Sequence, residues 1–264
     1  MTRVLWGVAA SAVAFLFIAA CSASTTAHKD AGQVVNQGTL RVCSTGDYRP
    51  FTYRDSHGWS GMDIDLAQDL AKHLGVGLDL VQTTWGNLIT DVGVKCDMAM
   101  GGITITPQRA ERALYSAPYL RDGKAAIVRC ADIAKFPNLN AIDQPGVRVI
   151  VNPGGTNSEF DKANVHRATI IDYPDNNTIF QQVISGNADV MITDASEIRW
   201  EATQNTQLCG SSVDNPFTSD GKAYLIAKGD PGLQQRVNDW LNAVQNDGTY
   251  ARVAQQWLGR VVGP

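Results

Sequence analysis

Thr104 and Arg109 are the first residues whose types and spacing suggest chemistry. Thr104 follows a strand expected at 98–102, and Arg109 stands in the first turn of a helix that Thr106 and Pro107 open. A guanidinium in this position can bind a carboxylate through two hydrogen bonds, assisted by N–H groups of the helix. The alternative is structural, because charged residues in a first helical turn are commonly solvated.

A second set of candidates comes from the other half of the chain. The glycines at 154–155 leave backbone N–H groups uncovered directly before Thr156, which is a common way to bind an anion. Thr156 and Glu159 also have the spacing of a capping box, in which two side chains bond the first N–H groups of a helix. Asp194 and Glu197 have the same spacing, so on this pattern alone Glu197 is interpreted as a helix-capping carboxylate.

Aromatic residues stand beside the same turns. Tyr48, Phe51 and Trp85 could line a ligand cleft, although aromatic rings near strand ends commonly belong to the core. The four histidines are scattered among polar residues, and no cysteine or histidine spacing matches a metal site. These residues support a binding cleft for a small carboxylate and leave open whether a reaction takes place there.

Strands and helices alternate along both halves of the chain, which predicts a mainly parallel α/β fold. The segments 87–101 and 178–193 match in order (helix, short loop, aspartate, strand, turn), and this match predicts two similar lobes. Ligands of open α/β sheets bind beyond the C-terminal ends of strands, so a site is expected after Ser44, Gly102, Val151 and Ile192. The expected strands are 40–44, 78–81, 98–102, 147–151, 189–192 and 222–228, and the expected helices are 61–75, 87–92, 178–185 and 232–258, with two more opening at 106 and 156.

The first 20 residues have the pattern of an export signal. Arg3 precedes an apolar run at 4–18 that is too short for a membrane span, and small residues follow it up to Cys21. The Ile-Ala-Ala-Cys ending is similar to the lipobox of bacterial lipoproteins, which implies lipidation of Cys21, with a plain secretory signal as the alternative. Residues 21–38 are small and polar, as in a flexible tether.

The mature chain of 244 residues, which is 264 less the 20 of the signal, has room for two lobes of about 100 residues. Without Arg3 it carries 21 basic and 26 acidic side chains and no basic run, which argues against nucleic acid as a partner. Besides Cys21 it has four cysteines, and an even number in an exported chain predicts two disulfides. Three connectivities are possible at this point.

Four segments carry a resemblance to a known family: Gly61-Met62-Asp63-Ile64-Asp65-Leu66-Ala67, Gly102-Ile103-Thr104-Ile105-Thr106-Pro107-Gln108-Arg109, Gly155-Thr156 and Asp194. They resemble the polar-amino-acid-binding proteins of ABC transporters. Those proteins are two-lobed, periplasmic-binding-protein-like α/β folds (type II venus-flytraps) with two crossover strands. The resemblance implies lobe 1 at 39–127 and 224–264, and lobe 2 at 128–223. It also implies that Tyr48 stacks on the ligand, that Arg109 holds a carboxylate with help from Thr104 and Thr156, and that Asp194 holds an α-ammonium group.

A narrower resemblance covers about residues 39–258. It is carried by Thr45-Gly46-Asp47-Tyr48-Arg49-Pro50-Phe51, Pro118-Tyr119-Leu120-Arg121-Asp122-Gly123-Lys124, Asp143-Gln144-Pro145-Gly146, Val151-Asn152-Pro153-Gly154-Gly155-Thr156-Asn157 and Thr193-Asp194-Ala195-Ser196-Glu197. These segments are similar to those of the cyclohexadienyl dehydratases, exported members of the same superfamily. Such enzymes convert prephenate to phenylpyruvate, and arogenate to phenylalanine, with loss of water and carbon dioxide and without a metal or redox cofactor.

The narrower resemblance implies roles for the cleft residues. Glu197 becomes the general acid, and burial must raise its pKa for the carboxyl group to carry a proton near neutral pH. Trp85 and Tyr48 pack against the substrate ring, and Asn152 either bonds the substrate or orients Glu197. The expected substrate-binding set is Tyr48, Trp85, Gly102, Thr104, Arg109, Asn152, Thr156, Asn157 and Asp194.

Partners and disulfides follow from the same resemblance. The expected ligand is a small carboxylate, prephenate or arogenate, bound by an exported protein with a lipid anchor at the outer face of the cell membrane or in the periplasm. The alternative is a non-catalytic receptor that delivers an amino acid or aromatic acid to an ABC permease. Cysteines at 43 and 96 are not expected in the family, so their joint appearance implies the additional disulfide Cys43–Cys96. Cys130 and Cys209, which bracket lobe 2, form the other predicted pair.

Overall fold

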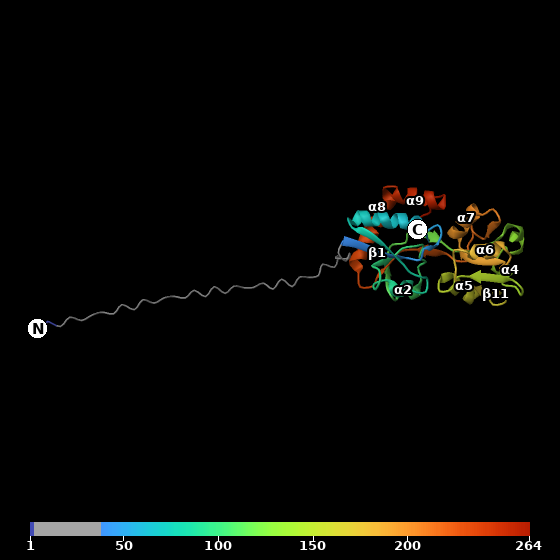
Figure 1. Ribbon diagram of the computed structural model, residues 1–264, viewed down its shortest axis with the longest axis horizontal. Coiled ribbons are helices and arrows are strands. Elements are labelled where there is room, and N and C mark those ends of the chain that lie inside the picture. Colours follow the sequence, from blue (N-terminus) through green and yellow to red (C-terminus); the bar gives the residue numbers. More distant parts are fainter. Residues whose placement is uncertain (3–37) are drawn as a thin grey trace.

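The computed structural model of the protein describes residues 1–2 and 38–264 (Figure 1). Almost all of the expected export signal, the lipidation site at Cys21 and most of the tether lie outside these residues. The described chain forms two α/β lobes, as predicted, and each lobe is built on a five-stranded sheet. None of the helices in this part of the chain has the length and apolar character that crossing a membrane requires.

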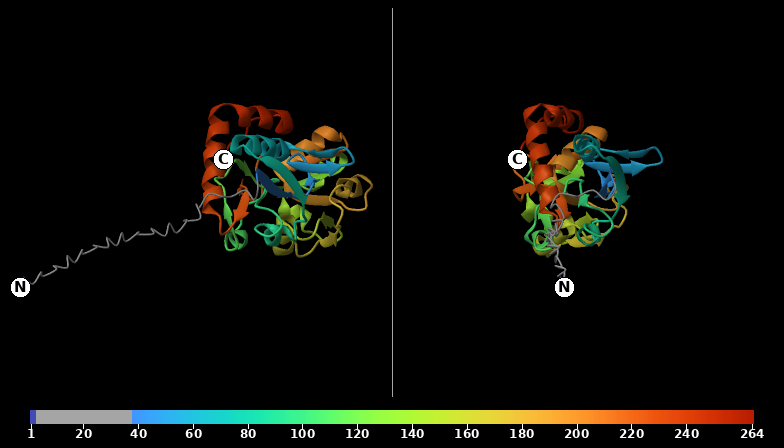
Figure 2. Two further views of the ribbon diagram at one scale, coloured as in Figure 1. Left: turned by 60° about the vertical axis from the view of Figure 1, so that its left-hand side comes forward. Right: turned by 90° about the vertical axis from the view of Figure 1, so that its left-hand side faces the viewer.

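The sheet of lobe 1 has the strand order β5-β1-β6-β15-β7. Strand β1 pairs in parallel with β5 and β6, whereas β15 is antiparallel to both of its neighbours. Helices α8 and α9 (red) cover this lobe next to α1 (Figure 2). The elements are β1 (Thr39–Ser44), α1 (Met62–Leu74), β5 (Gly77–Gln82), α2 (Leu88–Asp91), β6 (Met98–Ala99), α3 (Pro107–Ala110), β7 (Ala113–Tyr115), β15 (Leu225–Ala227), α8 (Pro231–Asn246) and α9 (Thr249–Leu258), with a small antiparallel sheet of β2 (Asp47–Tyr48), β3 (Thr52–Asp55) and β4 (Gly58–Ser60).

The sheet of lobe 2 has the strand order β11-β10-β12-β9-β13. Strand β10 pairs in parallel with β11 and β12, and β9 is antiparallel to β12 and β13. Apolar clusters cover both faces of each sheet, so each lobe has its own core. The elements are β9 (Lys124–Arg129), the 3₁₀ helix η2 (Cys130–Lys135), α4 (Leu139–Ile142), β10 (Arg148–Val151), α5 (Thr156–Asn164), β11 (Thr169–Asp172), α6 (Ile179–Ile184), β12 (Val190–Asp194), α7 (Ala195–Gln204) and β13 (Leu208–Ser211).

Two short strands carry the chain between the lobes. Strand β8 (Leu120–Asp122) leads into β9, strand β14 (Asp220–Lys222) leads back, and the two pair antiparallel. Strand β9 pairs with the second sheet along its length, so the expected limit at residue 128 falls inside this strand. The strand expected at 222–228 is observed as two strands. Lys222 ends β14 in the small sheet that β14 forms with β8, and β15 begins at Leu225 in the lobe 1 sheet.

The internal repeat is visible in matching ion pairs. The Arg41 backbone N–H donates to Asp97 Oδ2 at 2.9 Å, and the Arg41 guanidinium pairs with the same carboxylate. In lobe 2 the Arg148 backbone N–H donates to Asp189 Oδ2 at 3.0 Å, and its guanidinium pairs likewise. Arg41 lies on β1 and Arg148 on β10, and each aspartate directly precedes the parallel neighbour of that strand, β6 or β12. The matching segments seen in the sequence therefore occupy equivalent places in the two lobes.

Both predicted disulfides are present. Cys43 on β1 is joined to Cys96, which precedes the neighbouring strand β6, with 5.6 Å between the Cα atoms. Cys130 is joined to Cys209 on β13, with a Cα separation of 4.8 Å. The first bond ties β1, which leads into the cleft, to the loop before β6. The second ties the beginning of lobe 2 to its end.

Candidate functional site

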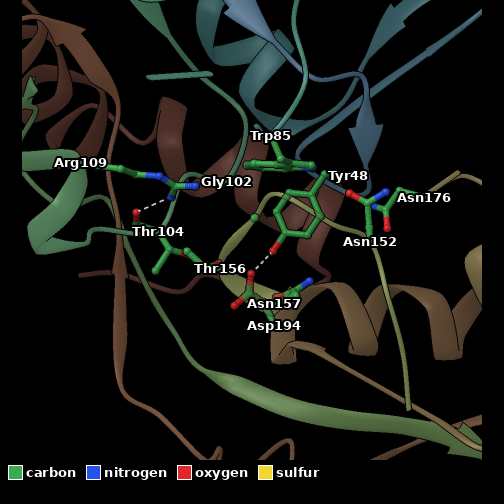
Figure 3. Close-up of a pocket in the computed structure, with 11 residues that line it drawn as sticks. Tyr48, Trp85, Gly102, Thr104, Arg109, Asn152, Thr156, Asn157, Asn176 and Asp194 are labelled. Atoms are coloured by element: carbon green, nitrogen blue, oxygen red, sulfur yellow. Dashed lines mark hydrogen bonds between the residues drawn. The ribbon is translucent and has the colours of Figure 1, made fainter. Parts of the chain in front are cut away.

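The cleft between the lobes contains a small cavity (Figure 3). Its volume of about 30 Å³ admits a few water molecules at most, so a larger ligand enters only when the lobes part. Glu197 is not among the lining residues. Every expected substrate-binding residue lines the cavity, together with Gly155 and Asn176: Tyr48, Trp85, Gly102, Thr104, Arg109, Asn152, Thr156, Asn157 and Asp194. Among the described residues, no group of three or more His, Cys, Asp and Glu side chains is arranged to hold a metal ion.

The lobe 1 wall of the cleft is aromatic. The Tyr48 ring stacks on Phe51, with 5.3 Å between centroids, and meets Trp85 edge-on at 5.4 Å. Gly102 permits this packing, because a Cβ at this position would lie 2.5 Å from the Tyr48 ring. The φ of Gly102 is 64°, which also favours glycine. An apolar ring of a ligand would therefore meet a rigid aromatic surface.

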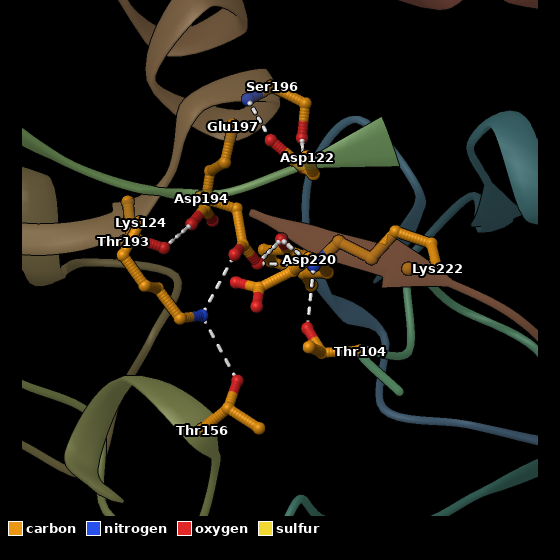
Figure 4. A network of polar contacts seen from close by, with 12 residues as sticks. Thr104, Asp122, Lys124, Thr156, Thr193, Asp194, Ser196, Glu197, Asp220 and Lys222 are labelled. Carbon is orange, nitrogen blue, oxygen red and sulfur yellow. Dashed lines mark hydrogen bonds and ion pairs between the residues drawn. The ribbon is translucent and has the colours of Figure 1, made fainter. Parts of the chain in front are cut away.

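A buried group of ion pairs, which we call the lysine bridge, joins Lys124, Asp194 and Lys222 (Figure 4). Lys124 Nζ lies 2.8 Å from Asp194 Oδ1, and Lys222 Nζ lies 2.5 Å from Asp194 Oδ2. The three residues are 2%, 3% and 0% exposed in chain order. The Tyr48 hydroxyl also donates to Asp194. Two cations against one carboxylate give the bridge a net charge of +1 at the centre of the cleft.

The carboxylate of Asp194 is fully engaged by these contacts. Burial acts to raise its pKa, but the charges and hydrogen bonds of Lys124 and Lys222 outweigh burial and hold the pKa well below its usual range. Its side chain does not cap α7. That helix is capped instead by Asp122 of β8, which accepts hydrogen bonds from Ser196 N at 3.2 Å and from Ser196 Oγ at 2.5 Å. An α-ammonium group would have to compete with two lysines for the oxygens of Asp194.

The lysine bridge also orients two threonine hydroxyls, one from each lobe. Lys222 Nζ donates to Thr104 Oγ1 at 2.8 Å, and Lys124 Nζ donates to Thr156 Oγ1 at 3.0 Å. Because each oxygen accepts from a lysine, its own proton is free to be donated into the cleft. The expected capping box at Thr156 and Glu159 is therefore wrong: Gly155 is the N-cap of α5, and no side chain caps that helix end.

Arg109 completes a group of donors. Its NH1 donates to the carbonyl of Thr104 at 2.8 Å, which fixes the guanidinium at the cavity and leaves its other N–H groups for a ligand. Thr106 caps α3 as predicted, because its Oγ1 accepts from Arg109 N at 3.3 Å. A guanidinium beside two hydroxyl donors is suited to hold a carboxylate.

Glu197 is 1% exposed and lies in the first turn of α7. Its Oε2 accepts from Thr193 Oγ1 at 2.5 Å, and Thr193 Oγ1 accepts from Asn157 Nδ2 at 2.9 Å. Asn157 Oδ1 accepts in turn from Lys124 Nζ at 2.5 Å, so every donor in this chain points toward Glu197. The interpretation of Glu197 as a helix cap is wrong, because a side-chain hydroxyl binds its carboxyl group and the helix end is capped by Asp122.

Burial raises the pKa of Glu197 well above its usual range. The Thr193 hydroxyl acts in the opposite direction by stabilising the carboxylate, whereas the negative charges of Glu201, Asp194 and Asp47 act together with burial. A carboxyl group in this setting holds its proton more tightly than a carboxyl group in water does. It can therefore act as an acid.

Two asparagines fix the lobe 2 rim of the cleft. Asn152 Nδ2 donates to the Pro174 carbonyl at 2.8 Å, so the hydrogen bond that reaches Glu197 comes from Thr193 and not from Asn152. Asn176, which sequence reasoning missed, donates from Nδ2 to the Asp47 carbonyl of lobe 1 at 2.7 Å. Its Oδ1 is buried and has no hydrogen-bond partner among the described residues. Asn176 thus joins the two lobes at the mouth of the cavity.

Sequence reasoning also missed Lys124 and Lys222, although a signal was present. The tetrapeptide Asp-Gly-Lys-Ala occurs twice, at 122–125 and 220–223, where the two crossing strands meet the lobes. A lysine before an apolar strand is ordinarily exposed, so each copy alone carries little information. The repetition is informative because both copies place a lysine at the same cleft.

Comparison with known proteins gives the class of the protein. Residues 40–260 match the bacterial extracellular solute-binding proteins, family 3. The chain belongs to this family, whose extracellular character supports export. Among solved structures, the chain is similar to an ancestral amino-acid-binding protein described as a precursor of cyclohexadienyl dehydratase, with a TM-score of 0.78, 36% identity, and coverage of 84% of this chain and 96% of that one.

The relatives also point to one particular protein within the class. The chain is 44% identical over 228 residues to the cyclohexadienyl dehydratase of Pseudomonas aeruginosa strain PAO1, covering 86% of this chain and 85% of the relative. It is 47% identical to a solved ancestral cyclohexadienyl dehydratase, with a TM-score of 0.52 and coverage of 84% of this chain and 93% of that one.

Proposed function

We propose that the chain is an exported cyclohexadienyl dehydratase that converts prephenate to phenylpyruvate, and arogenate to phenylalanine. The observation that carries the proposal is the state of Glu197, a fully buried carboxyl group with a raised pKa and no capping role. A transport receptor has no need of a protonated acid joined to its cavity wall, as Glu197 is through Thr193 and Asn157. The identity to the Pseudomonas aeruginosa dehydratase supports the same reaction class, a carbon–oxygen lyase.

The reaction needs a proton at one atom of the substrate. Glu197 donates its proton to the ring hydroxyl, the carbon–oxygen bond breaks, and water leaves. The bond between the ring and its carboxylate breaks in the same process, its electron pair completes the aromatic ring, and carbon dioxide leaves. Glu197 is left as a carboxylate. Each turnover therefore consumes one proton from solvent.

The other cleft residues hold and enclose the substrate. Arg109, with the hydroxyls of Thr104 and Thr156, binds the side-chain carboxylate that remains in the product. Tyr48 and Trp85 pack against the ring. No cation should be placed on the carboxylate that leaves, because holding it in the ground state would slow its loss. The lobes part to admit the substrate and then close around it, which excludes bulk water from the reacting groups.

The occupied state of Asp194 argues against an amino-acid receptor. Its two oxygens bind Lys124, Lys222 and the Tyr48 hydroxyl, so an α-ammonium group would have to displace a lysine, and arogenate, which carries this group, is expected to be the poorer of the two substrates. A net charge of +1 at the lysine bridge instead favours a ligand with more negative than positive charge, such as the dianion prephenate.

The test is a pair of matched substitutions. Glu197→Gln is expected to fold and bind but to lose turnover of prephenate by at least ~10²-fold, because an amide cannot donate the proton. Glu159→Gln, the same change at an exposed position of α5, should keep the parent rate. Phenylpyruvate formation is followed by absorbance. Parent activity in Glu197→Gln would refute the general-acid role, and a parent protein that binds a basic amino acid but leaves prephenate unchanged would be a transport receptor delivering to an ABC permease.

We further propose that Cys21 carries the lipid anchor suggested by the Ile-Ala-Ala-Cys sequence. Lipidation of Cys21 would place the domain at the membrane surface, with the segment 22–38 as the tether. Cys21→Ser should release the protein from the membrane fraction and abolish incorporation of labelled fatty acid. Unchanged labelling in the variant would contradict the proposal.

A further inference from the structure

If the chain is a dehydratase as proposed, Glu197 gives up its proton in every turnover. It must then take up another proton before the next one. Each cycle leaves Glu197 as a carboxylate with 1% of its surface exposed. A buried carboxylate of this kind has no direct access to solvent protons while the lobes are closed. A route for one proton per turnover must therefore lead to Glu197.

The hydrogen-bond chain already described is not suited to this task. Thr193, Asn157 and Lys124 all donate in the direction of Glu197, and the chain ends at an ammonium group that is 2% exposed. The neighbouring Asp194 carries no proton, because the two lysines of the bridge keep it ionised. These groups hold Glu197 in place, and the half-buried one among them, Asn157, has an amide side chain that cannot act as an acid.

Glu201 does reach solvent. It follows Glu197 by four residues on α7, so the two side chains lie on one face of the helix, one turn apart. It is half-buried, and burial raises its pKa to about 7, with the charge of Arg49 acting in the opposite direction. Arg49 is held at this place by the rings of Tyr53 at 3.2 Å and Trp200 at 5.7 Å.

Asp47 is the other carboxyl group that faces Glu197, and it belongs to lobe 1. Its position relative to Glu197 changes whenever the lobes part to admit substrate or release product. Glu201 shares a helix with Glu197 and keeps its position throughout the cycle. Of the described carboxyl groups around Glu197, only Glu201 therefore combines a fixed position with access to solvent.

We propose that Glu201 is the proton-reloading residue of the dehydratase. After water and carbon dioxide have left, the proton of the Glu201 carboxyl group moves to the Glu197 carboxylate, directly or through one water molecule. Glu201 then takes a proton from solvent. One proton enters per turnover, no other group changes its protonation, and the cycle begins again with a protonated Glu197.

The experiment separates the first turnover from later ones in stopped-flow measurements with prephenate at about pH 6 and pH 8. In Glu201→Gln the first turnover should keep the parent rate at pH 6, because Glu197 begins protonated. The steady-state rate at pH 8 should fall by about tenfold, so that a burst of phenylpyruvate appears. Glu201→His, which restores a titrating group near neutral pH, should recover most of this loss, and Glu159→Gln should behave as the parent.

Any other outcome would contradict the proposed relay, in which Glu201 passes a proton to Glu197. An unchanged steady-state rate in Glu201→Gln at both pH values would show that Glu197 is reloaded by another route. An equal loss in the first and later turnovers that histidine does not rescue would make Glu201 a structural residue. A parent protein without dehydratase activity would overturn the proposed function, and the relay with it.

Discussion

The lysine bridge predicts that Lys222→Met and Asp194→Asn rank in opposite order for stability and for binding. The more stable of the two variants should be the weaker binder of a carboxylate. Lys222→Met removes one cation and leaves Asp194 paired with Lys124 at 2.8 Å, a balanced ion pair in a buried place. The unbranched methionine can fill the space of the lysine stem. The free energy of unfolding should therefore fall by only about 1 kcal/mol. Asp194→Asn instead leaves two buried lysines without an anion, for which a loss of about 3–5 kcal/mol is expected.

Binding of a carboxylate should depend strongly on Lys222. Its Nζ lies 2.8 Å from Thr104 Oγ1, and a hydroxyl hydrogen bond adds about 2.7 Å, so the cation stands about 5 Å from a bound carboxylate. At an effective dielectric constant of about 20, this charge is worth about 3 kcal/mol. Thr104 also loses the contact that orients its proton. The Kd of phenylpyruvate should rise by about 100-fold in Lys222→Met.

Urea unfolding and calorimetric titration with phenylpyruvate measure the two effects on the same samples. Asp194→Asn should be the less stable variant, and it should keep binding to a carboxylate because both lysines remain. Lys222→Met should be the more stable variant and the poorer binder. If Lys222→Met is the less stable of the two, or binds phenylpyruvate as the parent does, the bridge does not act as described.

Two further predictions follow from single residues. Arg109→Lys should raise the KM for prephenate, because lysine keeps the charge but not the two-pronged geometry, and Arg109→Ala should raise it further; an unchanged KM would remove Arg109 from the site. Asp161 is 0% exposed, and burial raises its pKa to about 8, so the folded state holds the proton more tightly than the unfolded state. The stability that this provides is present below about pH 4 and is lost as the pH rises to about 8. Asp161→Asn should therefore match the parent near pH 4 and exceed it by up to about 4 kcal/mol at pH 7 in urea unfolding, and a pH-independent difference would contradict the shift.

Local sequence rules predicted those parts of the fold that depend on local forces. The helix at 61–75 is observed as α1, with Leu66 and Leu70 fully buried and Gly75 ending it in the left-handed conformation at φ 71°. Thr106 and Pro107 open α3 because capping involves residues only three apart. Spacing patterns and turn chemistry are enough for such elements.

The capping boxes were misread because tertiary partners outcompete the helix end. Thr156 and Asp194 bind ammonium groups, which form stronger charge-assisted hydrogen bonds than backbone N–H groups do. Those ammonium groups belong to Lys124 and Lys222, and the latter lies 28 residues after Asp194 in the chain. No local window contains both partners. The candidate cleft could be assembled from turns and a resemblance, but the charges that organise it depend on how the two lobes meet.

Closure of the lobes and the acidity of Glu197 depend on the same contacts. Tyr48 of lobe 1 donates to Asp194, and Asp47 beside it contributes negative charge and cover near Glu197. When the lobes part, Glu197 loses the charge of Asp47, so its pKa falls and the proton is held less tightly. When they close, the negative charge of Asp47 raises the pKa again and the proton is held more tightly. Glu197 therefore holds its proton most tightly in the closed state, the state in which a substrate is enclosed and a general acid is needed.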